Sequence, residues 1–131
     1  MTIKSTFLDG IIYTELFGEI DYNSVIQQID FTLSLKDKIV NRFELHDHTH
    51  TKRINLSADA IRKIAIYSNK TKDIFKLSFL AVYAPNDFTF GIARMFETFY
   101  EMEKHPINAR IFRSKEAAVE FLKEKMNEHG C

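Results

Sequence analysis

The sequence predicts an α/β fold in which helices cover a mixed, mainly parallel sheet. After an N-terminal pair of strands, strand-like segments alternate with segments of helical periodicity, an order typical of parallel sheets with right-handed crossovers. The run KLSFLAVYA, residues 76–84, is almost continuously apolar, as expected of a parallel strand buried on both faces. The length of 131 residues and the 45% content of hydrophobic residues predict a single domain, residues 1–131.

A β-hairpin is expected at the N-terminus, where Asp9-Gly10 separates the apolar runs TIKSTFL and IIYTELFGEI. Asp-Gly is a strong signal for a two-residue turn because both turn positions need positive φ. The second run has apolar residues on both faces, which predicts an internal strand. Further strands are expected at residues 40–47, 76–84 and 109–112, which gives about five strands in all, and the polar residues 49–55 are expected to form a loop.

Four helices are expected between and after these strands. Asp21, Ser57 and Ser114 precede three of them as N-caps, and Pro85-Asn86-Asp87 opens the other. The first helix is predicted over residues 22–35, the second ends near residue 69, and the third runs from 87 to about 104, where His105-Pro106 ends it. The residues predicted to face inward are Val25, Ile26, Ile29 and Leu33; Ile61, Ile64, Ala65 and Ile66; Ile92, Met95, Phe96, Phe99 and Met102; and Ala117, Ala118, Phe121, Leu122 and Met126.

The charge balance and the cysteine count exclude several classes of protein. Lys and Arg together number 18, as do Asp and Glu, so the net charge is zero, whereas nucleic-acid binding usually needs a basic surplus on one face. The single cysteine, Cys131, cannot form an intrachain disulfide, which fits a reducing compartment. The segment MTIKSTFLDG lacks the apolar stretch of a signal peptide, and no apolar run approaches the ~18 residues that a membrane span needs. We therefore expect a cytoplasmic protein with no membrane span and no nucleic-acid partner.

The stretch HDHTH carries three of the five histidines, His46, His48 and His50, at alternate positions. On a strand these side chains share one face, about 7 Å apart per step, so they could bind a divalent metal if the chain bends. The alternative is that the strand runs out into solvent at its carboxyl end, where exposed histidines need no explanation. The metal interpretation lacks the compact, paired ligand spacing of a structural zinc site, and we favour the solvated strand end.

No catalytic motif accompanies these histidines. The sequence contains no GxGxxG, Walker A, GxSxG or HExxH pattern, so no catalytic residue and no cofactor is predicted. The sequence favours a protein that is not an enzyme. Ligands of open α/β sheets gather beyond the carboxyl ends of the strands, so a site is expected where the HDHTH segment, residues 85–90 and residues 112–114 meet.

Three segments of the second half form a recognisable set: FLAVYAPNDFTFGIARMFETF, ARIFRS and KEAAVEFL. Together they resemble the SpoIIAA-like family of small bacterial proteins, which is grouped with STAS and SEC14-like domains. The resemblance covers residues 76–122 and is only topological before them. It implies a βα superhelix around a mixed, mainly parallel sheet. It implies no assigned activity, but kinship in fold to anti-sigma-factor antagonists and to lipid-carrying SEC14 domains.

The resemblance points to the segment GIARM, which begins at Gly91, as the shared feature of these proteins. One interpretation is that exposed amides at the helix start and Arg94 hold an anionic group, with Asp87 and Phe90 as further ligand contacts. The structural alternative is that Gly91 permits tight packing of helix on sheet, and that Arg94 pairs with a carboxylate such as Glu97.

Ser57 occupies a place comparable to that of the phosphorylatable serine in the antagonist branch, at the start of the helix after the third strand. The Asp-Ser-Ser-Gly pattern of that branch is absent here. Ser57 is therefore a candidate phospho-acceptor, and a plain N-cap explains it as well.

The aromatic content suggests what the protein contacts. Twelve Phe and five Tyr occur without a Trp, and the third helix is crowded with Phe88, Phe90, Phe96, Phe99 and Tyr100. These rings either fill the core or form a contact surface. The leading hypothesis is a non-enzymatic binding or regulatory module that acts through protein contact and forms a homodimer. The alternatives are a carrier of a small apolar or anionic lipid-like ligand, which needs a cavity of roughly 300 Å³ or more, and a metal-dependent enzyme built on the HDHTH histidines.

Overall fold

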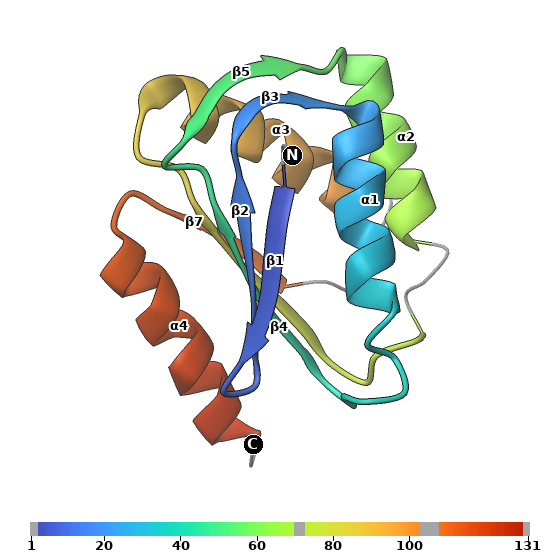
Figure 1. Cartoon of the computed structure of the whole chain (residues 1–131), viewed down its shortest axis with the longest axis vertical. Helices are drawn as coiled ribbons and strands as arrows, with labels where there is room; N and C mark the ends of the chain where they lie inside the picture. Colours follow the sequence, from blue (N-terminus) through green and yellow to red (C-terminus); the bar gives the residue numbers. More distant parts are fainter. Residues whose placement is uncertain (1–2, 70–72, 103–107, 130–131) are drawn as a thin grey trace.

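Helices cover both faces of a five-stranded sheet in this computed structural model, which describes residues 3–69, 73–102 and 108–129 (Figure 1). The strand order is β1-β2-β4-β6-β7, with β1 antiparallel to β2 and every other neighbouring pair parallel. These strands span Ile3–Leu8, Ile11–Leu16, Arg42–Asp47, Ser78–Tyr83 and Asn108–Phe112. The predicted mixed, mainly parallel sheet is confirmed.

The N-terminal hairpin is formed as expected. Asp9 and Gly10 have φ values of 52° and 82°, which are the positive angles that a two-residue turn of this kind requires. The turn places β2 between β1 and β4, so the strand with two apolar faces is indeed internal.

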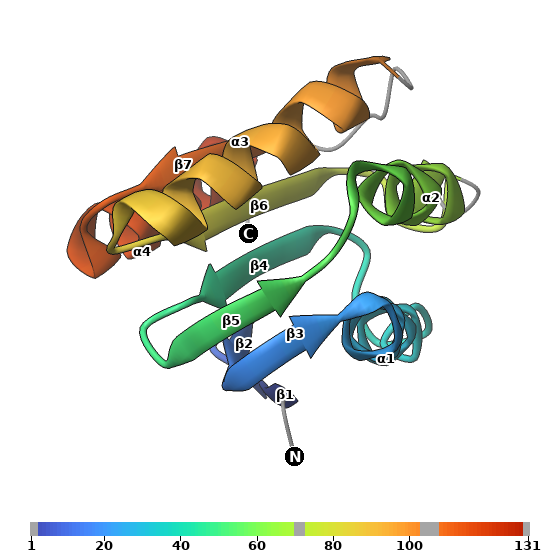
Figure 2. The ribbon, with the colours of Figure 1, turned by 90° about the horizontal axis from the view of Figure 1, so that it is seen from above.

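Within the described residues the helices are α1 (Tyr22–Leu33), α2 (Ala58–Asn69), α3 (Asp87–Met102) and α4 (Lys115–Glu128). Backbone amides donate to the side chains of Asp21, Ser57 and Ser114, which confirms these three N-caps. Helix α4 packs on one face of the sheet, whereas α1, α2 and α3 lie on the other (Figures 1 and 2). The predicted end of the third helix at His105-Pro106 lies outside the described residues.

One buried apolar cluster lies between α4 and the sheet. Its buried members are Ile11, Phe43, Leu45, Phe79, Ala81, Ala118, Phe121 and Leu122. On the opposite face Leu80, Val82 and Ala93 form a small cluster near α3. Ile29 of α1 and the α2 residues Ile61, Ile64 and Ala65 are buried on that face as well.

A second, two-stranded sheet corrects the expectation of a loop at residues 49–55. Strand β5 (Thr51–Asn55) pairs in parallel with β3 (Gly18–Asp21). The polar sequence TKRIN forms a strand because the exposed backbone of β3 offers it hydrogen-bond partners. The β3–β5 pair lies beyond the carboxyl ends of β2 and β4 (Figures 1 and 2). It therefore lies next to the edge of the main sheet where a site is expected.

The buried faces of α1 and α3 also differ from the predicted apolar stripes. In α1 the buried residues are Ser24, Gln28, Ile29 and Thr32, because two of these polar side chains bond to a carboxylate inside the protein. In α3 Thr89 and Ala93 are buried, whereas Met102 is 66% exposed. Both helices therefore turn polar as well as apolar residues toward the sheet.

Candidate functional site

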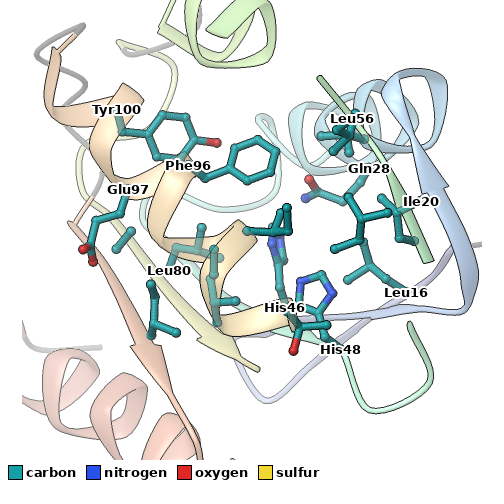
Figure 3. A pocket seen from close by; sticks show the side chains of 18 residues that line it. Leu16, Ile20, Gln28, His46, His48, Leu56, Leu80, Phe96, Glu97 and Tyr100 are labelled. Carbon is teal, nitrogen blue, oxygen red and sulfur yellow. The ribbon is translucent and has the colours of Figure 1, made fainter. Parts of the chain in front are cut away.

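An apolar cavity of about 70 Å³ lies between the sheet and helix α3 (Figure 3). Side chains of β4, β6 and β7 border it together with α1, α3 and the β3–β5 pair. The apolar lining includes Leu16, Ile20, Leu80, Val82, Ile92 and Phe96. The polar lining consists of Gln28, His46, His48, Thr89, Glu97 and Tyr100. The cavity thus combines mostly apolar walls with a few polar side chains, as binding sites for small molecules do.

Two larger hollows are more open to solvent. One, of about 300 Å³, lies between β5 and the start of α3 and is bordered by Lys52, Arg53 and Phe88. The other, of about 210 Å³, is bordered by the Asp47–Lys115 ion pair, whose carboxylate oxygen and ammonium nitrogen are 3.0 Å apart. Neither hollow is enclosed by helix and sheet as the apolar cavity is.

A fully buried carboxylate, Glu44, lies on the same face of β4 as the cavity. Its Oε1 accepts hydrogen bonds from Arg42 Nε and Thr32 Oγ1, both at 2.9 Å. Its Oε2 accepts from Gln28 Nε2 and His46 Nε2. Burial alone would raise the pKa of Glu44, but the charges and hydrogen bonds of Arg42 and His46 lower it to about 2. The carboxylate is therefore ionised, and it fixes both the histidine ring and the glutamine amide at the cavity wall.

His48 follows the end of β4 and is held by its own chain of hydrogen bonds. The Thr51 hydroxyl donates to the carbonyl oxygen of Leu16 at 2.7 Å. It therefore accepts from His48, whose Nδ1 lies 3.0 Å away. Burial, with a smaller contribution from the charge of His46, lowers the pKa of His48 to about 4. At neutral pH the ring is uncharged and carries its proton on Nδ1, because the Thr51 hydroxyl proton is already used.

The prediction of a solvated strand end is wrong for His46 and His48. Both rings project into the cavity (Figure 3), and the side chain of His46 is only 16% exposed. The reason is the β3–β5 pair and α3, which cover the carboxyl end of β4. His50 alone of the three fits the prediction, since it is exposed and stacks on Phe17 at a ring distance of 5.3 Å.

The predicted metal trio is not assembled, because the turn after His48 carries His50 away from the cavity. Among residues 3–69, 73–102 and 108–129, no group of three or more His, Cys, Asp or Glu side chains is placed to hold a metal ion. His129 lies instead against Phe79, at 5.4 Å between ring centroids. His105 and Cys131 lie outside the described residues.

Gly91 and Arg94 occur on the outer surface of α3. An added Cβ at Gly91 would meet no atom within 4 Å, so the interpretation that this glycine permits tight packing is wrong. Arg94 is 63% exposed, and its Nε lies 3.6 Å from Glu97 Oε1. The predicted pairing of Arg94 with a carboxylate is thereby confirmed, and neither residue lines the cavity.

Asp87 and Phe90 interact with the loop after β7 rather than with the cavity. Arg113 Nη2 donates to Asp87 Oδ1 at 2.8 Å, and its guanidinium lies 4.3 Å above the centre of the Phe90 ring. This contact joins the start of α3 to residues 112–114, so two of the three segments expected at the carboxyl edge of the sheet, residues 85–90 and 112–114, meet there.

Ser57 is exposed and caps α2, with Ala60 N donating to its Oγ at 3.0 Å. Its predicted role as an N-cap is confirmed. Phosphorylation at this serine stays a prediction.

Several cavity residues were not predicted as site residues. Thr89, Phe96 and Tyr100 follow one another at helical spacing on the face of α3 that borders the cavity, and burial raises the pKa of Tyr100. A signal was available in the sequence for Gln28, which lies four positions before another polar residue, Thr32, on the first helix. Residues with this spacing share a helix face, and here that face meets the buried Glu44.

Across the described part of the chain, no helix has the length and apolar character required to cross a membrane. No protein-family model matches the chain, and no curated protein matches it significantly.

A solved structure does match. It is an uncharacterised protein of the DUF3478 family from Shewanella loihica PV-4, described as having a SpoIIAA-like fold. The two chains are 18% identical in sequence and superpose with a TM-score of 0.58, over 92% of this chain and 91% of the other. At this identity the match concerns the fold alone. Together with the strand order and the helices on both faces of the sheet, it establishes that this chain has a SpoIIAA-like fold.

Proposed function

We propose that this protein is a non-enzymatic binding module that holds a small, mainly apolar molecule in the cavity between its sheet and α3. The observation that supports the proposal is an apolar cavity with two half-buried histidines, His46 and His48, in its wall. Sites of this composition bury the apolar body of a ligand and use a few polar groups to orient it.

The size of the cavity favours a small molecule over a lipid-like one. The volume of about 70 Å³ is well below the roughly 300 Å³ with which ligand pockets of drug size begin. A lipid chain would require α3 or the β3–β5 pair to move outward. We therefore limit the proposal to molecules with a few non-hydrogen atoms and do not extend it to a lipid carrier.

Titration followed by NMR tests the proposal. The full-length chain, labelled with ¹⁵N, is titrated with 1-butanol, methyl propyl ether and n-pentane, which have equal numbers of non-hydrogen atoms. Because ligands this small bind weakly, affinities in the millimolar range are expected. Saturable shifts should occur at the amides of Leu80, Val82 and Ala93, and should be absent from the opposite face of the sheet.

A matched pair of variants on α3 links binding to the cavity. Ala93→Leu adds three carbon atoms to a residue that is 8% exposed and borders the cavity, so it should abolish the shifts. Arg94→Ala changes the next residue, which points outward, and should leave them unchanged. Absence of saturable binding by all three probes, or equal binding to Ala93→Leu and the unchanged protein, would contradict the proposal.

Contact with another protein or with a second copy of the chain is the second proposal, and one surface feature favours it. Phe88 is 50% exposed beside the hollow that Lys52 and Arg53 border, and we take this ring as the candidate contact point. In sedimentation velocity, a homodimer of the unchanged protein that becomes a monomer in Phe88→Ser would support it. A monomer at all concentrations would contradict the homodimer.

A further inference from the structure

We infer that the cavity selects a neutral ligand whose polar end is a hydrogen-bond donor, such as an alcohol, over an ether or a carboxylate of similar size. This inference rests on the proposed function, and it adds the chemical class of the ligand. It follows from the hydrogen bonds that fix His48 at the cavity wall.

The proton of the His48 ring is placed by two successive hydrogen bonds. Thr51 gives its hydroxyl proton to the carbonyl of Leu16, so toward His48 it acts only as an acceptor. Nδ1 of His48 must therefore carry the proton that spans the 3.0 Å to Thr51 Oγ1. In a neutral imidazole the other nitrogen is then a lone-pair acceptor.

That remaining nitrogen, Nε2, is the group that His48 offers to a ligand. The described residues provide no hydrogen-bond partner for His48 side-chain atoms other than Thr51. The ring itself lines the cavity (Figure 3). A half-buried acceptor beside apolar walls gains most from a ligand that brings a donor, because an unpaired polar group in such a place costs free energy.

Two further polar groups of the wall, Gln28 and His46, are also committed by hydrogen bonds. Gln28 commits its amide nitrogen to Glu44 and Thr32, which leaves its amide oxygen as an acceptor. His46 spends its Nε2 proton on the same ionised carboxylate. A ligand carboxylate would meet the acceptor atoms of His48 and Gln28, with the negative charge of Glu44 behind them, so an anion is disfavoured.

The titration with the three probes of equal size tests the inference at pH 8, with butyrate as a fourth probe. One hydrogen bond of ordinary strength corresponds to roughly five- to tenfold in affinity. We expect 1-butanol to bind five- to tenfold more tightly than methyl propyl ether, which has the same atoms but no donor. Butyrate should bind more weakly than 1-butanol. Equal affinities of the alcohol and the ether would overturn the inference and leave the proposed function standing, whereas absence of binding by all probes would overturn both.

Two variants assign the preference to His48. Thr51→Val removes the acceptor that holds the proton on Nδ1, so the ring can carry its proton on Nε2 instead and donate it to the ether oxygen. The ratio of the affinities for 1-butanol and methyl propyl ether should therefore fall toward one. His48→Phe keeps an aromatic ring without nitrogen and should also lose the preference while still binding n-pentane. A preference for the alcohol that persists in His48→Phe would contradict the role of His48. If either variant fails to fold, the comparison of alcohol with ether in the unchanged protein still decides the inference.

Discussion

At the scale of single residues, the main feature is that one buried carboxylate organises the polar side of the cavity. Glu44 is 0% exposed and accepts hydrogen bonds from Arg42, Thr32, Gln28 and His46. A buried charge is tolerated only when it is paired and hydrogen-bonded, and these donors come from β4 and α1. The carboxylate thereby ties the helix to the sheet and holds two cavity residues in place.

Replacing Glu44 with Gln should destabilise the fold strongly. The amide has one acceptor oxygen for the four donors, and Arg42 loses its paired charge. Breaking a buried pair in this way typically costs about 3–5 kcal/mol of unfolding free energy, which urea denaturation measures. Glu124→Gln, at an exposed position of α4, is the matched control and should change the value by less than about 0.5 kcal/mol. Equal losses in the two variants would contradict the role given to Glu44.

His48 should make stability depend on pH in mildly acidic solution. Its pKa falls from 6.5 to about 4 on folding, so between these values the unfolded chain binds more protons than the folded one. Stability is then lost as the pH falls from 6.5 to 4, by up to about 3 kcal/mol. Glu44 has a folded pKa of about 2 rather than 4.5. Its contribution to stability is therefore lost at lower pH, between 4.5 and 2.

Urea unfolding at a series of pH values checks the contribution of His48. In His48→Gln the slope between pH 6.5 and 4 should be much reduced, whereas the loss below pH 4.5 should remain. A slope in His48→Gln as steep as in the unchanged protein would show that another group causes it.

For single residues, the sequence predicted which face of a strand a side chain occupies better than it predicted whether that face is buried. Alternation along the strand correctly placed His46 and His48 on one face, since both line the cavity. The burial of that face could not be predicted, because it depends on Gln28 and Thr32 of α1 and on the cover given by α3. Spacing along the strand likewise did not predict the turn that separates His50 from His48.

At the scale of secondary-structure elements, turns and helix caps were predicted correctly from local sequence, whereas a strand that depends on a distant partner was missed. Asp9-Gly10, Asp21 and Ser114 carry their own turn or cap chemistry, and each predicted element boundary was found. Strand β5 has the polar sequence TKRIN and carries little strand signal of its own. It exists because β3 lies beside it, and such a long-range partner is invisible to local patterns. The missed β3–β5 pair is also the reason that the histidine segment was expected to be exposed.

The N-cap of α1 offers a test at this scale. The Asp21 side chain accepts from Ser24 N at 2.8 Å, and these bonds to Ser24 lower its pKa. Asp21→Ala should cost about 1 kcal/mol of unfolding free energy, whereas Asp21→Asn, which can still cap, should cost much less. Thermal unfolding monitored by circular dichroism distinguishes the two. Equal destabilisation by both substitutions would mean that capping is not the cause.

At the scale of the whole molecule, the alternation of strands and helices was sufficient to predict a mainly parallel sheet with helices on both faces. Aromatic rings fill much of the cluster under α4. The ring of Phe79 stacks on Phe43 at 5.7 Å and meets Phe121 edge-on at 6.4 Å. The smaller apolar cluster near α3 leaves room for the cavity.

Phe79→Ala should therefore be among the most costly substitutions, with a loss of about 3–5 kcal/mol. Phe88→Ala removes an identical side chain that is 50% exposed and should cost less than about 1 kcal/mol. Urea denaturation of both variants provides the measurement. Similar losses would mean that the packing of Phe79 under α4 does not contribute to stability as its burial indicates.

The order of the strands also governs how quickly the chain reaches its native state. In the main sheet, as far as the chain is described, only β1 and β2 are joined by a tight turn, and each other neighbouring pair is joined by a connection that contains a helix. Closing such connections costs chain entropy before the contacts that reward it can form. Refolding after dilution from denaturant should therefore be slower than that of a helical bundle of equal length, with the hairpin as the one part of the sheet able to form early.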